Sequence, residues 1–164
     1  MWAYQFQKLQ NVAEKHGWTK FISMQNHYSL CYREEEREMN KYCHETGVGL
    51  IPWAPLYRGL LARPLGTTAT TREESMKGNP MFSGLSDADV EIIRRVQELA
   101  EKKGWKMSQV ALVWIIQKKT IPIVGFSSLA RLDEAVAVRG KSLTDEEVKY
   151  LEEPYQPKAV LGHS

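Results

Sequence analysis

The stretch TIPIVGFSSLARLDEAV, residues 120–136, contains the structural unit from which the rest of the fold can be predicted. Residues 120–124 form a short apolar run typical of a β-strand. Gly125 then permits a turn, and the two serines that follow suit the start of a helix. The pattern predicts a helix over residues 129–138, which Gly140 ends. The stretch is thus one strand followed by one helix.

The same order recurs toward the N-terminus, where apolar runs over residues 20–24 and 49–53 each precede a helical pattern. Strands that alternate with helices favour right-handed βα units around a parallel sheet. Three strands cannot close a barrel, since a complete eight-unit barrel needs about 250 residues. We therefore predict part of a larger α/β fold. The predicted helices cover residues 2–16, 33–45, 87–103, 108–118, 129–138 and 145–153. Capping patterns at Ser86–Asp89 and Thr144–Glu147 begin the third and the last of them, and Gly104 ends the third. The helix over residues 108–118 is apolar on most faces and is expected to be buried.

Two local patterns predict details of packing. Trp2, Phe6, Leu9 and Ala13 recur at helical spacing, which indicates one packed face of the first helix. Pro52 lies inside the second predicted strand, and a proline there favours an edge or terminal position.

Residues 56–85 have little periodicity and many turn residues. So long a connection inside a compact domain is usually functional or mobile. The tail over residues 155–164 has no pattern, and no internal repeat is visible. Residues 1–164 are accordingly interpreted as one partial domain.

The composition excludes several classes of protein. Of the 164 residues, 43% are hydrophobic and 26% are charged, which is typical of a globular protein and excludes wholesale disorder. The net charge of +2 is too balanced to predict a nucleic-acid partner. No apolar run approaches the roughly 20 residues of a membrane span, and the first residues do not form a signal peptide. Two cysteines are too few for a disulfide framework, so we expect a protein of the cytoplasm.

No motif of classical catalysis is visible. The sequence contains no P-loop, no G-x-S-x-G elbow and no C-x-x-C. None of the four histidines has a second ligand at a dependable metal spacing. The trio Cys43, His44 and Glu45 is dense in ligand types, but it is interpreted as a solvated helix end.

Polar and aromatic residues at strand ends are more informative, because ligands of parallel α/β folds bind at the carboxyl ends of strands. Gln25 and Asn26 end the first strand, where their amides could bind a carboxamide, a base or a sugar, or could cap the backbone. Trp53 ends the second strand and could stack on a flat ligand ring or belong to the core.

The turn after the third strand has the elements of a phosphate site. Gly125 permits the turn, Ser127 and Ser128 supply hydroxyls at a helix N-terminus, and Arg131 lies in the first helical turn. An ordinary serine cap beside a solvated arginine would give the same pattern.

Taken together, five ordered segments resemble the aldo-keto reductase superfamily, in particular its fungal aryl-alcohol dehydrogenase-like branch. The resemblance covers essentially the whole chain but only the C-terminal half of that family's barrel. It accounts for Pro52 and for the long segment after it. The segments are MWAYQF (1–6), SMQNHYSL (23–30), GLIPWAPL (49–56), QVALVW (109–114) and IPIVG (121–125).

The resemblance implies a partial (β/α)8 TIM barrel of about three parallel strands with flanking helices, and an NADP(H) cofactor. Gln25 matches the glutamine that holds the nicotinamide carboxamide, and Trp53 matches the aromatic residue on the nicotinamide ring. Residues 56–85 would form the loop that covers the cofactor. The start of the pyrophosphate-covering segment is matched by Ala54, Pro55, Leu56, Arg58 and Gly59, and the group around the 2′-phosphate by Ser127, Ser128 and Arg131.

The sequence also departs from the family's pattern. Ala135 stands where many members have an asparagine that contacts adenine. The catalytic Asp, Tyr, Lys and His of the family lie in the N-terminal half of the barrel, which this chain does not match. Tyr28, Tyr57 and His27 do not match those motif positions.

We therefore expect the NADP(H)-binding half of an enzyme that reduces aldehydes and ketones or oxidises aryl alcohols, inactive by itself. A non-catalytic interaction or cofactor-sensing protein and a truncated gene product are the alternatives. The expected partners are a small carbonyl or alcohol substrate in the whole enzyme and a second copy of the chain, through exposed barrel edges, with no nucleic acid and no membrane.

Overall fold

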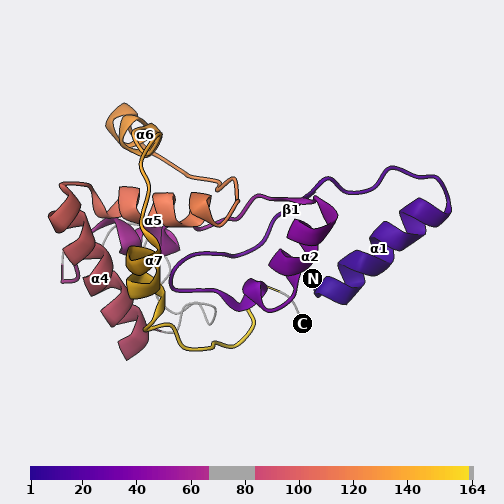
Figure 1. Cartoon of the computed structure of the whole chain (residues 1–164), viewed down its shortest axis with the longest axis horizontal. Coiled ribbons are helices and arrows are strands. Elements are labelled where there is room, and N and C mark those ends of the chain that lie inside the picture. The colour runs from indigo at the N-terminus through magenta and orange to yellow at the C-terminus, as the bar shows by residue number, and fades with distance from the viewer. Residues whose placement is uncertain (67–83, 163–164) are drawn as a thin grey trace.

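The computed structural model describes residues 1–66 and 84–162. A short parallel sheet lies between a helical body and an outlying N-terminal helix (Figure 1). The elements are, in chain order, α1 (Ala3–Lys15), β1 (Ser23–Met24), η1 (Glu34–Glu36), α2 (Met39–Thr46), β2 (Gly49–Leu50), η2 (Tyr57–Ala62), α4 (Asp87–Lys103), α5 (Met107–Gln117), α6 (Leu129–Val136) and α7 (Asp145–Glu152).

The sheet consists of β1 and β2 in parallel, with Ser23 opposite Gly49. Its pairing continues beyond the two strands as an isolated parallel bridge between His27 and Trp53. Residues 120–124, the predicted third strand, make too few backbone hydrogen bonds to form a regular strand. The N–H groups of Ile121 and Ile123 nevertheless donate to the carbonyls of Leu50 and Pro52, at 2.8 Å each.

This donor pattern makes residues 121–123 a parallel neighbour of residues 50–52, because alternate N–H groups bond alternate carbonyls and both segments advance in the same direction. Residues 49–53 therefore lie between two neighbours. Of the two positions predicted for Pro52, edge or terminal, the structure has the terminal one: Pro52 follows the end of β2 at Leu50, in a segment with neighbours on both sides. A proline is tolerated there because the donors toward the β1 segment come from Gly49, Ile51 and Trp53.

The two faces of the sheet have different surroundings. Leu50 packs on α1 and α2 in a small buried cluster with Phe6, Met39 and Cys43. Because side chains alternate along a strand, the opposite face carries the intervening residues. We call it the open face, and its residues are Gln25, His27, Ile51, Trp53, Ile121 and Ile123.

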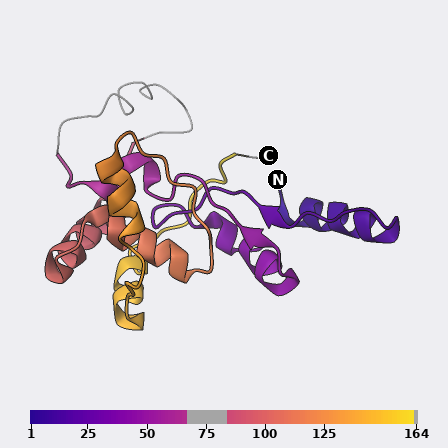
Figure 2. The same cartoon turned by 90° about the horizontal axis from the view of Figure 1, so that it is seen from above.

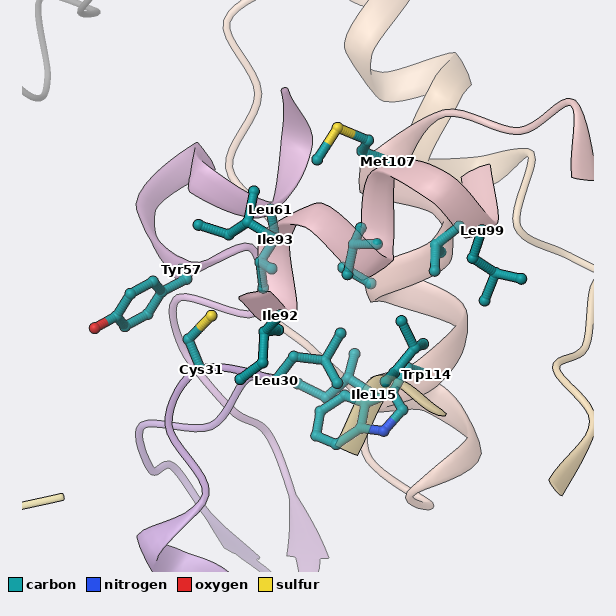
Figure 3. Close-up of a cluster of buried hydrophobic side chains, with 14 of the residues drawn as sticks. Leu30, Cys31, Tyr57, Leu61, Ile92, Ile93, Leu99, Met107, Trp114 and Ile115 are labelled. Atoms are coloured by element: carbon teal, nitrogen blue, oxygen red, sulfur yellow. The ribbon is translucent and has the colours of Figure 1, made fainter. Parts of the chain in front are cut away.

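The larger core lies in the helical body, where side chains of α4, α5 and α7 form one buried cluster. Figure 3 shows part of it, including Trp114 and Ile115, both fully buried. The prediction of a buried helix over residues 108–118 is confirmed by α5, whose residues 107–115 are all buried. Predicted caps are confirmed as well: Ser86 accepts from the N–H of Asp89 at the start of α4, and Gly104 ends that helix with a φ of 64°.

Two predictions about helices are wrong. Leu9 of α1 is exposed, and the buried residues of that helix are Phe6, Gln10 and Ala13. This happens because α1 extends away from the helical body, so only one narrow stripe meets the rest of the chain (Figure 2).

The predicted helix over residues 33–45 is divided into η1 and α2. Its first turn is held by the C-terminal tail: Glu34 accepts hydrogen bonds from the Tyr155 hydroxyl at 2.6 Å and from the Lys158 N–H at 2.7 Å. Glu38, between the two helices, has a non-helical backbone with φ −139° and ψ −54°, and this interrupts the predicted helix.

The long segment over residues 56–85 begins with order. Residues 57–62 form η2, which packs on α5 and α4 and buries Leu61 completely. Residues 67–83, which include most of the predicted cofactor-covering loop, lie outside the described residues.

Candidate functional site

Gln25 and Trp53, the two predicted nicotinamide contacts, lie on the open face of the sheet. The register that pairs Ser23 with Gly49 places Gln25 opposite Ile51. This pair lies two residues before the bridge between His27 and Trp53, on the same face. Gln25 is exposed and Trp53 is half-buried. Both lie at the carboxyl ends of their strands, where parallel folds bind ligands.

A stack of three rings orients Trp53. The His27 ring lies 4.1 Å from the Trp53 ring at an interplanar angle of 12°, and 4.2 Å from the Tyr32 ring on its other side. Burial, with the positive charges of Arg58 and Lys158, lowers the pKa of His27 to about 3. His27 is therefore a neutral ring that supports one face of the indole.

Unsatisfied polar atoms gather just after β1. Both ring nitrogens of His27, Oδ1 of Asn26 and Oγ of Ser29 are buried without a hydrogen-bond partner in the part of the chain that the structure describes. The Asn26 amide nitrogen does donate to Oδ1 of Asn40 at 2.7 Å. Unpartnered buried polar atoms cost about 1–3 kcal/mol each, so their concentration marks this strand end as a place where contacts are incomplete.

The segment after Trp53, predicted to start the pyrophosphate-covering loop, has an unusual backbone. Ala54, Tyr57 and Arg58 have φ values of 52°, 44° and 61°, and Gly59 has 97°. Left-handed backbone is unfavourable for residues with a Cβ, and it concentrates at ligand-binding segments. Among the predicted residues here, Pro55 is buried, while Ala54, Leu56, Arg58 and Gly59 are half-buried.

The second predicted anion site lies at the start of α6. The Arg131 guanidinium donates to Oγ of Ser127 at 3.2 Å, and Ser128 caps the helix by accepting from the Arg131 N–H at 3.4 Å. All three residues are exposed. The structure thus brings the predicted residues together in one turn, and it also shows that Ser128 serves as a helix cap. Ala135 lies further along the same helix and is half-buried.

These groups leave the sheet at the same end. Ile123 bonds Pro52, so the turn from Gly125 onward starts beside the segment that follows Trp53. The open face, the left-handed segment and the start of α6 therefore form one region. By contrast, a hollow of about 460 Å³ between the α4–α5 turn and α6, lined by Trp105 and Gln109 among others, contains none of the predicted residues.

The trio Cys43, His44 and Glu45 lies at the end of α2, as predicted, with Cys43 buried toward α1 and the other two exposed. Over residues 1–66 and 84–162, no cluster of three or more His, Cys, Asp or Glu side chains could hold a metal ion.

Sequence reasoning missed a group of polar contacts next to the left-handed segment. Nζ of Lys158 lies 2.5 Å from Oδ1 of Asp89 and 3.4 Å from the Tyr57 hydroxyl. These residues are 69 and 101 positions from Lys158 in sequence, and no local pattern connects them. The capping position of Asp89 was visible in the sequence, but its second partner was not.

Comparison with known proteins decides the family. The model of the Aldo/keto reductase family matches residues 3–156. The chain belongs to the aldo/keto reductase family. Because that family has a (β/α)8 fold, the short parallel sheet with its helices is consistent with a partial barrel.

Fungal relatives agree with this assignment. The chain is 53% identical over 166 residues to an aldo-keto reductase of Metarhizium robertsii, dtxS3, with 100% of this chain and 45% of that protein covered. It is 52% identical over 163 residues to versiconal hemiacetal acetate reductase of Aspergillus parasiticus, covering 98% and 48%. It is 48% identical over 162 residues to a putative aryl-alcohol dehydrogenase of Schizosaccharomyces pombe, C977.14c, covering 99% and 46%. The chain thus spans about half the length of the curated relatives it matches.

Among residues 1–66 and 84–162, no helix combines the length and the apolar character of a membrane span.

Proposed function

We propose that this chain binds NADP(H) as part of an aldo-keto reductase that interconverts aldehydes or ketones and alcohols. The observation that carries the proposal is the convergence of three features at one end of the sheet: the open face with Gln25 and Trp53, the left-handed segment over residues 54–59, and the start of α6.

Each feature fits one part of the cofactor. The Gln25 amide has both a donor and an acceptor for the nicotinamide carboxamide. The Trp53 indole, backed by His27, offers a flat surface to the ring. Residues 54–59 cover the pyrophosphate, and Ser127 with Arg131 binds the 2′-phosphate. When bound, the nicotinamide supplies or accepts the hydride, and the protein orients it.

The substrate class rests on relatives as well as on geometry. One similar protein is named versiconal hemiacetal acetate reductase, and another is named putative aryl-alcohol dehydrogenase. A carbonyl or alcohol substrate is therefore proposed for the whole enzyme. The free, buried thiols of Cys31 and Cys43 fit a reducing compartment such as the cytoplasm.

The chain alone is proposed to be inactive, because the catalytic acid that the family resemblance implies is not among the residues matched here. General acid catalysis contributes about 10²–10⁴-fold to a reaction rate, and a bound cofactor alone does not replace it.

Titration of NADPH and NADH into the 164-residue chain tests this proposal. Gln25→Leu should weaken both cofactors by about two- to tenfold, because both carry the carboxamide and a neutral hydrogen bond contributes about 0.5–1.5 kcal/mol. Gln7→Leu, an exposed glutamine of α1, is the matched control and should change neither. Absence of NADPH binding at millimolar concentration would contradict the proposal, as would steady NADPH oxidation with an aromatic aldehyde.

A further inference from the structure

The C-terminal tail, residues 155–161, is held firmly across the start of η1. The N–H of Arg33 donates to the Tyr155 hydroxyl at 2.9 Å, which itself donates to Glu34. The N–H of Leu161 donates to the Tyr32 hydroxyl at 2.8 Å. The backbone on either side of Lys158 is therefore fixed in place without help from the Lys158 side chain.

That side chain contacts Asp89 of α4 and Tyr57 of η2. Its partner Asp89 has a side chain only 2% exposed and is itself held by Ser86, whose hydroxyl donates to Oδ2 at 2.9 Å. Burial alone would lower the pKa of Lys158, but the hydrogen bond to Asp89 raises it above its ordinary value. The pair is thus a charged, shielded contact between the tail and the first turn of α4.

Tyr57 is the third member of this contact. The Lys158 ammonium lies 3.4 Å from the Tyr57 hydroxyl and 5.2 Å from the centre of its ring, so it contacts both parts of the side chain. Figure 3 shows Tyr57 at the margin of the apolar cluster, with its hydroxyl directed away from Leu61 and Ile93. The apolar core holds one side of the ring and Lys158 holds its polar end.

Tyr57 is also part of the left-handed segment. Its φ of 44° is positive, as are those of Ala54 (52°) and Arg58 (61°) on either side of it in the chain. The N–H of Tyr57 donates to Ala54 and the N–H of Gly59 donates to Leu56, at 2.9 Å each. Local preference opposes this backbone, since residues with a Cβ avoid it. Contacts from elsewhere in the fold must therefore maintain it.

We propose that the C-terminal tail is a positioning element of the cofactor-binding segment: Lys158, held by Asp89, fixes Tyr57 and through it the left-handed turn over residues 54–59. Lys158 acts through Tyr57 and touches no part of the cofactor itself. The role of this turn in cofactor binding rests on the proposed function, whereas the link between the tail and the turn does not.

Amide hydrogen exchange of the full chain without cofactor tests the link directly. Lys158→Met alone would leave a buried carboxylate unpaired, and the fold could be lost. The informative variant is therefore Lys158→Met with Asp89→Asn, which removes both charges and leaves a polar group beside Ser86. The control is Lys103→Met with Glu147→Gln, which removes an ion pair between α4 and α7, 2.8 Å between Nζ and Oε1. Its lysine is as exposed as Lys158, 20% against 21%, while its carboxylate is less buried, 17% against 2%.

The tail variant should speed exchange of the Tyr57, Gly59 and Leu61 amides by about ten- to a hundredfold, the loss expected for a hydrogen bond to a charged group. Amides of α5 should exchange at the wild-type rate. A loss of global stability would instead speed exchange throughout the core, α5 included. The control variant should leave residues 54–61 unchanged. Unchanged exchange in the tail variant, or equal acceleration in the control or throughout α5, would overturn the proposal.

A parallel NADPH titration separates this inference from the proposed function. If wild type binds NADPH, the tail variant should bind it more weakly by a similar factor, and equal affinity would refute the positioning role. If wild type does not bind NADPH, the proposed function fails, and the exchange rates still decide whether the tail holds the turn.

Discussion

At the scale of single residues, Arg131 is where cofactor choice can be decided. NADP carries a 2′-phosphate where NAD carries a hydroxyl, and the Arg131 guanidinium lies beside Ser127 at the exposed start of α6. Arg131→Ala should weaken NADPH binding by about ten- to a hundredfold and leave NADH binding nearly unchanged. Calorimetric titration is best done on a protein in which the N-terminal barrel half of a relative is joined to this chain. Equal losses for both cofactors would remove Arg131 from the site.

His27 gives the molecule a specific dependence on pH. The folded protein keeps its ring neutral, with a pKa lowered from 6.5 to about 3, whereas the unfolded chain binds a proton below pH 6.5. Its contribution to stability is therefore complete above pH 6.5 and is lost as the pH falls toward the folded pKa, by up to about 1.4 kcal/mol per pH unit.

Urea unfolding at pH 7 and pH 4.5 measures this dependence. His27→Phe keeps a flat ring between Tyr32 and Trp53 but cannot be protonated, so its free energy of unfolding should fall less over that interval than that of wild type. The same fall in both proteins would show that His27 is not the cause.

At the scale of elements, the segment over residues 121–123 is held beside residues 50–52 by two backbone hydrogen bonds, and we expect these bonds to position the start of α6. Ile123→Pro removes the donor to the carbonyl of the buried Pro52 and should lower the free energy of unfolding by about 1–3 kcal/mol. Because Ser127 follows only four residues later in the chain, its position should change and NADPH affinity should fall as well. Ile123→Ala keeps the N–H and removes only a side chain that is 46% exposed, so it should have a much smaller effect on both. Denaturant unfolding and NADPH titration compare the two variants.

At the scale of the whole molecule, the open face carries exposed apolar side chains. Ile121 is 70% exposed there, and residues 121–123 and β1 form the two edges of the sheet. Exposed edges and apolar faces favour association, so we expect a dimer or a larger species. Its mass in solution should therefore be a multiple of the 18.8 kDa of one chain.

Light scattering over a range of concentrations measures this association. Ile121→Lys should shift the distribution toward the monomer. Leu129→Lys, at a position 78% exposed on α6 and outside the open face, should not. A stable wild-type monomer at high concentration would contradict the expectation.

The sequence by itself determined the order of strands and helices, their caps and the family, because these depend on neighbouring residues. Ser86, Gly104 and Thr144 act within one helical turn, and the buried character of α5 follows from its uninterrupted apolar residues. The clustering of Ser127, Ser128 and Arg131 is local for the same reason.

Only the tertiary structure decided the rest, because it depends on residues far apart in sequence. The contacts of Glu34 with the tail join residues more than 120 positions apart, and the neutral His27 follows from its burial between two rings and from two distant cations. Lys158, in a segment with no sequence pattern, meets Asp89 and Tyr57 because burial of a charge requires a partner, and the fold rather than local preference supplies it.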